Sequence, residues 1–234
     1  MSEKDESRWP GPYATLLGAL LFFLMLIPIV SDGGLGSIVF RFGFTAIFLS
    51  GIYIASDRRL LDRVEFYLVG VVLIVEWGTL FIEVPRGGEI RTAAVGCILF
   101  LTAFVQLKSL LKQDEVSTDT IFGGINVYVL MALAFMMLHT LAEMLQPGSY
   151  LIFGQELTSY LMEQGVDEVL PTMVYFSFVT ITTLGYGDMV PVTGVSRILV
   201  SVEALFGQLY LATFVARIVG LYVGSRNAPQ EAKD

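Results

Sequence analysis

Charge, cysteine and histidine are all scarce in this chain. Charged residues make up only 15% of the 234, against about 25% in soluble domains, while 55% are hydrophobic. This balance is typical of an integral membrane protein. The one cysteine, Cys97, excludes an intrachain disulfide. The one histidine, His139, is not part of a His-Glu-x-x-His pattern, so we expect no metal-dependent intramembrane enzyme and no enzymatic activity. The net charge of −8 argues against nucleic-acid binding.

The hydrophobic residues are gathered in long runs. About 20 consecutive apolar residues are needed for a helix to cross a bilayer. The first twelve residues are polar and acidic, which excludes a cleavable signal peptide. We therefore expect a multi-pass protein in contact with the lipid bilayer. The runs that predict membrane-spanning helices cover about residues 13–30, 36–55, 66–84, 91–111, 121–144 and 194–222.

Lys and Arg are absent from residues 141–190. They occur instead in the second connection, around the fourth run and in the C-terminal tail, whereas Arg86 in the third connection is an exception. Cytoplasmic loops of membrane proteins carry an excess of Lys and Arg. The distribution therefore predicts a cell (plasma or inner) membrane protein with both termini cytoplasmic and with residues 145–193 outside.

A short glycine-containing motif lies between the last two hydrophobic runs, where residues 183–188 read Thr-Leu-Gly-Tyr-Gly-Asp. Gly185 and Gly187 accept unusual dihedrals without a Cβ penalty, and such a backbone can direct its carbonyls to one side. Rings of carbonyls of this kind can replace the water shell of a dehydrated K⁺. The motif resembles the selectivity filter of tetrameric potassium channels, whose pattern is Thr-x-Gly-Tyr-Gly-Asp.

The six runs predict an all-α membrane protein with six transmembrane helices. For residues 121–222, under half of the chain, the resemblance implies two of these helices with a re-entrant pore helix, beginning at Pro171, and a filter loop between them. One chain contains one such motif, and a closed ring of carbonyls needs several copies, so we expect a cyclic oligomer. The family forms homotetramers. The permeant K⁺ is the only implied ligand, with no other cofactor. It would be held by the backbone carbonyls of Thr183, Leu184, Gly185 and Tyr186 and by the Thr183 hydroxyl, with Gly187 completing the filter.

The residues expected to support the filter depart from the family pattern. Thr180 fits it, but the family usually has two tryptophans at the positions of Tyr175 and Phe176. The Tyr175 hydroxyl could reach Asp188, whereas Phe176 cannot donate a hydrogen bond. Val179 replaces a glutamate that some members use to bind the aspartate. This altered support predicts faster loss of conduction rather than loss of selectivity.

The last hydrophobic run matches the family's inner helix. Gly207 stands at the position of a glycine hinge, although a glycine in a membrane helix can also serve close packing. Gln208, Leu211 and Val215 share one helix face, which the resemblance places on the cavity. Gln208 suits a water-filled chamber, and Leu211 and Val215 could form a constriction that closes by dewetting.

The fourth run lacks a voltage sensor, because no cation lies between Arg91 and Lys108. Steep voltage gating needs about 3–4 gating charges per subunit, so we expect no steep voltage gating here. Arg41 and Glu76, in the second and third runs, are predicted to form an intramembrane ion pair, with Glu83 as the alternative partner. His139 suggests a helix–helix hydrogen bond or a group that titrates near neutrality.

The expected organisation has a four-helix peripheral unit and a pore unit. The predicted function is passive, potassium-selective conduction that is not steeply voltage-gated. The alternative is the pore subunit of a K⁺ transport system gated by a separate regulatory protein. The acidic outer segment 145–170 would form a vestibule that attracts cations. The predicted units are a cytoplasmic N-terminal segment at 1–12, a peripheral membrane domain at 13–111, a cytoplasmic linker at 112–120, a pore domain at 121–223 and a short cytoplasmic tail at 224–234.

Overall fold

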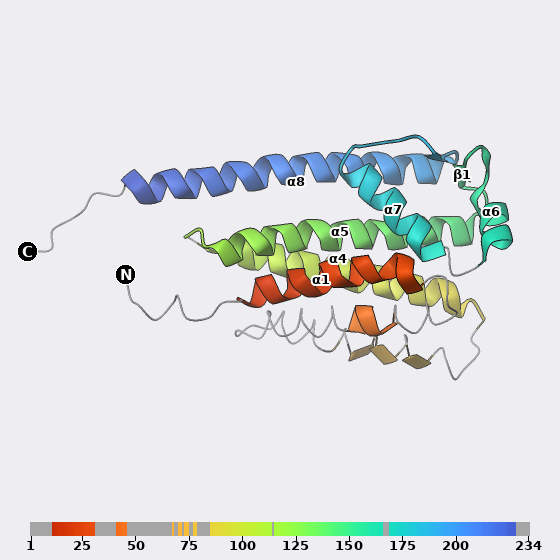
Figure 1. The fold of residues 1–234 in the computed structure, drawn as a ribbon, viewed down its shortest axis with the longest axis horizontal. Coiled ribbons are helices and arrows are strands. Elements are labelled where there is room, and N and C mark those ends of the chain that lie inside the picture. Colours follow the sequence, from red (N-terminus) through yellow and green to blue (C-terminus); the bar gives the residue numbers. More distant parts are fainter. Residues whose placement is uncertain are drawn as a thin grey trace, which may run out of the picture.

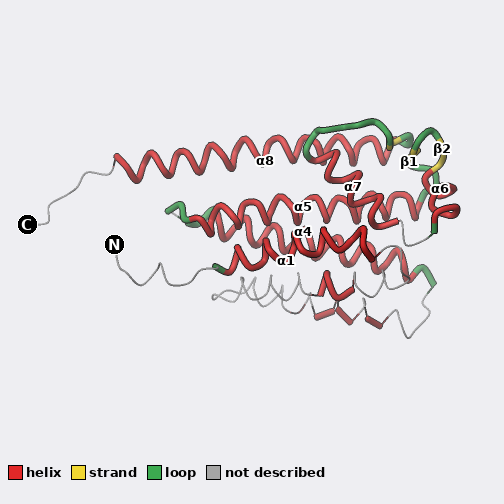
Figure 2. Tube along the Cα trace, viewed as in Figure 1, coloured by secondary structure: helices red, strands yellow, loops and turns green. Residues whose placement is uncertain are grey.

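The computed structural model describes residues 11–30, 41–45, 67, 70–71, 73–74, 77–78, 85–113, 115–165 and 169–227. Within these ranges the chain is mainly helical (Figures 1 and 2). The helices are α1 (Pro12–Val30), α4 (Gly87–Leu110), α5 (Thr118–Leu145), α6 (Leu157–Gln164), α7 (Val169–Ile181) and α8 (Gly194–Asn227), and the strands are β1 (Tyr150–Ile152), β2 (Gln155–Glu156) and β3 (Met189–Pro191).

Helix α5 is the centre of the bundle. It packs against α1, α4, α7 and α8, and most of its side chains are buried because its sequence is apolar on every face. Figure 1 shows α1 and α5 running in one direction and α4 and α8 in the other, so α1 begins and α8 ends at the same end of the bundle. In contrast to α5, α8 exposes much of its apolar surface.

The start of α5 is fixed by local hydrogen bonds. The Ser117 hydroxyl accepts from the Thr120 amide at 3.1 Å, and the Thr120 hydroxyl accepts from the Ser117 amide at 3.3 Å, which is a capping box. The Asp119 carboxylate accepts from the Ala14 amide at 3.0 Å in the first turn of α1. The amide group of Asn126 donates to the Tyr13 carbonyl at 2.8 Å. The first helix is therefore tied directly to α5.

Among the described residues, three helices are long and apolar enough to cross a membrane: Gly87–Leu110, Thr118–Leu145 and Gly194–Gly224. They correspond to the fourth, fifth and sixth predicted runs, and the protein is a membrane protein. The first run forms the shorter apolar helix Pro12–Ile27. Most of the second and third runs lie outside the described residues, as do Glu76 and Glu83, so six spans and the Arg41–Glu76 pair remain predictions. Arg41 itself is buried in the helical stretch 41–45.

The expectation of an all-α fold needs one correction. The segment after α5 contains a three-stranded antiparallel sheet in the order β2-β1-β3, with Leu151 paired with both Glu156 and Val190. The sheet joins residues before the pore helix to residues after the motif at 183–188. These strands have only two or three residues each, too few for an alternating pattern to be visible in the sequence.

Three predicted boundaries also shift. Helix α7 begins at Val169 rather than at Pro171, because a proline is tolerated throughout the first turn, where the amide groups have no helical partner. Helix α5 runs from Thr118 to Leu145, against a predicted run of about 121–144. Helix α8 runs from Gly194 to Asn227, against a predicted run of about 194–222.

Candidate functional site

The motif at 183–188 forms an extended loop that leaves the end of α7 and runs beside α8 to β3 (Figure 2). Its backbone has positive φ at every second residue: 57° at Thr183, 56° at Gly185 and 78° at Gly187. This alternation lets successive carbonyls face the same side of the loop. A β-branched residue rarely adopts positive φ, and such strain costs about 1–3 kcal/mol, so Thr183 must be held by its surroundings.

Hydrogen bonds to the end of the pore helix hold this loop. The Thr183 amide donates to the Thr180 carbonyl at 2.8 Å. The Leu184 and Gly185 amides both donate to the Val179 carbonyl, at 2.9 and 3.2 Å. The first amide groups of the motif are therefore directed back into α7. Because the C-terminal end of a helix carries partial negative charge, α7 also favours a cation near this loop.

The outer end of the motif is held by Asp188. The Tyr175 hydroxyl donates to Asp188 Oδ2 at 2.6 Å, which is the contact considered possible from the sequence. The Met189 amide donates to Asp188 Oδ1 at 3.0 Å, and the Phe153 amide donates to the Asp188 carbonyl at 2.9 Å. Phe153 lies in the turn between β1 and β2, so the outer sheet and the pore helix both fix this end of the loop.

The inner end of the motif rests on α5 and α8. The Tyr128 hydroxyl donates to the Ile181 carbonyl at 3.0 Å. Gly207 lies against the same carbonyl, where a Cβ atom would be 2.1 Å from the oxygen. The side-chain amide of Gln208 donates to the Thr183 hydroxyl at 3.0 Å. Gly207 therefore serves close packing, one of the two roles predicted for it, and the hinge role stays a prediction.

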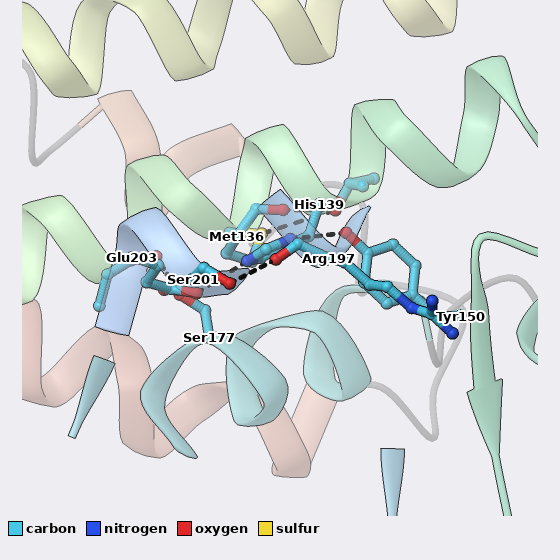
Figure 3. A network of polar contacts seen from close by, with 9 residues as sticks. Met136, His139, Tyr150, Ser177, Arg197, Ser201 and Glu203 are labelled. Atoms are coloured by element: carbon cyan, nitrogen blue, oxygen red, sulfur yellow. Dashed lines mark hydrogen bonds and ion pairs between the residues drawn. The ribbon is translucent and has the colours of Figure 1, made fainter. Parts of the chain in front are cut away.

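A fully buried polar network joins β1, α5, α7 and α8 (Figure 3). His139 of α5 bonds through Nδ1 to the Tyr150 hydroxyl and through Nε2 to Glu203 of α8, each at 2.7 Å. The other carboxyl oxygen of Glu203 lies 2.5 Å from the Ser177 hydroxyl in α7. Phe176 packs edge-on against the rings of His139 and Tyr150, with centroids 5.1 and 5.3 Å away. The helix–helix hydrogen bond expected of His139 is therefore present.

Sequence reasoning missed Glu203, Ser177 and Tyr150. The available signal was the pairing of a lone glutamate in the last hydrophobic run with the lone histidine in the fifth, since buried ionisable groups in membranes are usually paired. It also missed Glu143, whose carboxylate accepts from the amides of Gly148 and Tyr150 at 2.9 and 3.2 Å. Thr158 donates to the same carboxylate at 2.6 Å, so Glu143 holds the outer segment on the end of α5.

Much of the predicted conduction surface is exposed in the single chain. Leu184 is 55% exposed and Tyr186 is 67% exposed, and side-chain space beside Gly185 and Gly187 is open. On α8, Leu211 and Val215 are also exposed, on the same face as Gln208. Large apolar groups rarely face water in such numbers, so further protein or lipid covers these surfaces.

The C-terminal half of α8 is joined to the end of α4. The Arg217 guanidinium donates to the carbonyls of Leu111 and Gln113, at 2.8 and 2.9 Å. Arg217 therefore connects α8 to the C-terminal end of α4 and to the residues that follow it. Glu156 and Glu163 of the segment 145–170 are exposed, and the vestibule stays a prediction.

The comparisons agree with this geometry. The family model described as "Ion channel" matches residues 148–223. The matched segment runs from the start of the outer sheet through α7 and the motif to near the end of α8. The chain therefore carries an ion-channel domain, which supports passive ion conduction across a membrane. Searches of curated proteins and of solved structures gave no significant match.

Proposed function

We propose that this protein is a potassium-selective channel in which four copies of the chain surround one pore. The observation that carries the proposal is the alternation of positive φ at Thr183, Gly185 and Gly187 within the Thr-Leu-Gly-Tyr-Gly-Asp motif. In four copies, the carbonyls of residues 183–186 and the Thr183 hydroxyl would form successive rings of oxygen. Such rings replace the hydration shell of K⁺ as it enters the filter.

The exposed surfaces support a cyclic assembly. A single chain leaves the loop and one long face of α8 uncovered, and a ring of carbonyls can close only between copies. Steep voltage gating is not part of the proposal. Helix α4 has no cation between Arg91 and Lys108 and is packed along α5. We expect the peripheral unit to affect the pore instead through direct contacts with α8, such as that between Leu111 and Arg217.

The test is the flux of K⁺ against Na⁺ in liposomes that contain the purified protein. We expect K⁺ to pass and Na⁺ to be excluded in the wild type. Gly185→Asp should abolish K⁺ flux, because Gly185 has φ of 56° and the added carboxylate would lie beside the ion path. Gly220→Ala is the matched control, since a Cβ there meets no atom within 4 Å. Equal permeation of Na⁺ and K⁺ in the wild type would refute the proposal.

A further inference from the structure

Each proton of the buried network can be assigned to a donor and an acceptor. Its members are Tyr150, His139, Glu203, Ser177 and the Ala132 carbonyl, to which the Ser177 hydroxyl lies at 2.6 Å. The network joins β1, α5, α8 and α7. His139, Ser177 and Glu203 are fully buried, so in this environment an unused donor is costly.

The Ser177 hydroxyl determines which groups donate and which accept in the network. It has one proton and two close oxygen neighbours, Ala132 O and Glu203 Oε1. The Ala132 carbonyl can only accept, so Ser177 gives its proton there. The short contact between Ser177 and Glu203 then needs a proton from the carboxyl group.

The hydrogen bonds of Tyr150 and His139, at the other end of the network, agree with this assignment. Burial raises the pKa of the Tyr150 hydroxyl above its ordinary value, so Tyr150 keeps its proton near neutral pH. Its hydroxyl lies against His139 Nδ1, to which it donates. The neutral imidazole then carries its own proton on Nε2 and donates it to Glu203 Oε2. Every proton of the network has one acceptor.

An ion pair between His139 and Glu203 fits the same contacts less well. A doubly protonated imidazole would donate to the Tyr150 oxygen, which leaves the Tyr150 proton without an acceptor among the described residues. A carboxylate at Glu203 would also make Ser177 share one proton between two acceptors. Glu143, one turn along α5 from His139, is occupied by three donors from the outer segment and contributes no acceptor to the network.

We propose that Glu203 is a protonated, neutral positioning residue, which donates to Ser177 and thereby fixes the pore helix to α8 and α5. Phe176, packed on His139 and Tyr150, covers the network on one side. The effect on conduction depends on the proposed function, whereas the proton assignment does not.

A matched pair of substitutions tests the assignment. In Glu203→Gln the amide oxygen can accept from His139 and the amide nitrogen can donate to Ser177, as the protonated acid does. In Glu143→Gln, whichever way the amide is turned, its nitrogen faces a backbone amide of Gly148 or Tyr150. Both glutamates are buried, so burial alone does not separate the two variants.

The readouts are the thermal unfolding of the purified assembly, its infrared spectrum and K⁺ flux in liposomes. We expect Glu203→Gln to unfold close to the wild type, and Glu143→Gln and Glu203→Leu several degrees lower. The wild type should show the carbonyl band of a buried protonated carboxyl, and Glu203→Gln should lose it. K⁺ flux in Glu203→Gln should stay within about twofold of the wild type, a difference of about 0.4 kcal/mol at 1.4 kcal/mol per tenfold.

Two results would overturn the proposal. One is a Glu203→Gln assembly that unfolds as early as Glu203→Leu. The other is a wild-type spectrum without a carboxyl band that depends on Glu203. If the wild type carries no K⁺, the proposed function fails, but the band and the order of unfolding temperatures still decide the state of Glu203.

Discussion

Replacement of Gly207 by alanine tests the contact between α8 and the end of α7 at Ile181. The new Cβ would lie 2.1 Å from the Ile181 oxygen, 2.9 Å from Ile181 Cγ1 and 3.1 Å from the carbonyl carbon. Ordinary van der Waals contact begins at 3.4 Å, so α8 and the end of α7 must separate by about 1.3 Å. A rotamer change cannot relieve this overlap, because the closest atom belongs to the backbone.

The energetic effect is the difference between two opposing terms. Overpacking of a well-packed site costs about 1–3 kcal/mol. An alanine in a helix gains about 0.5–1 kcal/mol over glycine, which reduces but does not cancel that cost. The Ile181 carbonyl is also held by Tyr128 at 3.0 Å, so it cannot move without loss of this hydrogen bond. We expect each chain to be destabilised by about 1–2 kcal/mol, which lowers the unfolding temperature by roughly 5 °C.

The assay is thermal unfolding of the purified assembly, followed by K⁺ flux in liposomes. Gly220→Ala in the same helix serves as the control and should match or exceed the stability of the wild type, since it gains helix propensity without a clash. K⁺ flux should fall in Gly207→Ala because the displaced Ile181 carbonyl lies two residues before Thr183, the start of the proposed filter. If Gly207→Ala unfolds at or above the wild-type temperature, the close approach of α8 to Ile181 is wrong.

Two further predictions concern the ends of the pore. Tyr175→Phe removes the 2.6 Å hydrogen bond to Asp188, so the K⁺ current should decay faster while the ratio of K⁺ to Na⁺ permeability is unchanged; single-channel openings as long as those of the wild type would count against this. Arg217→Gln removes the hydrogen bonds from the guanidinium to the carbonyls of Leu111 and Gln113. These bonds contribute about 1–3 kcal/mol before solvent screening of the guanidinium charge is included, so their loss should change the open probability in planar bilayers. Arg197→Gln, which loses only a 3.5 Å contact to Pro191, should leave it unchanged.

The sequence by itself predicted the membrane location, three of the long apolar helices and the loop at 183–188. These features depend on local properties: the length of a hydrophobic run, and glycines at positions that need positive φ. The hydrogen bond between Tyr175 and Asp188 could also be predicted from the sequence, because Asp188 is part of the motif and Tyr175 lies 13 residues before it.

Only the tertiary structure decided which side chains surround α7 and α8. The partners of Glu203 are 64 and 26 residues away in the sequence, and Arg217 reaches carbonyls more than a hundred residues earlier. Such contacts depend on how α4, α5, α7 and α8 are placed against one another, which no local pattern encodes. The close approach of Gly207 to Ile181 also came from this packing, because a glycine needed for close packing and a glycine needed for a hinge look alike in the sequence.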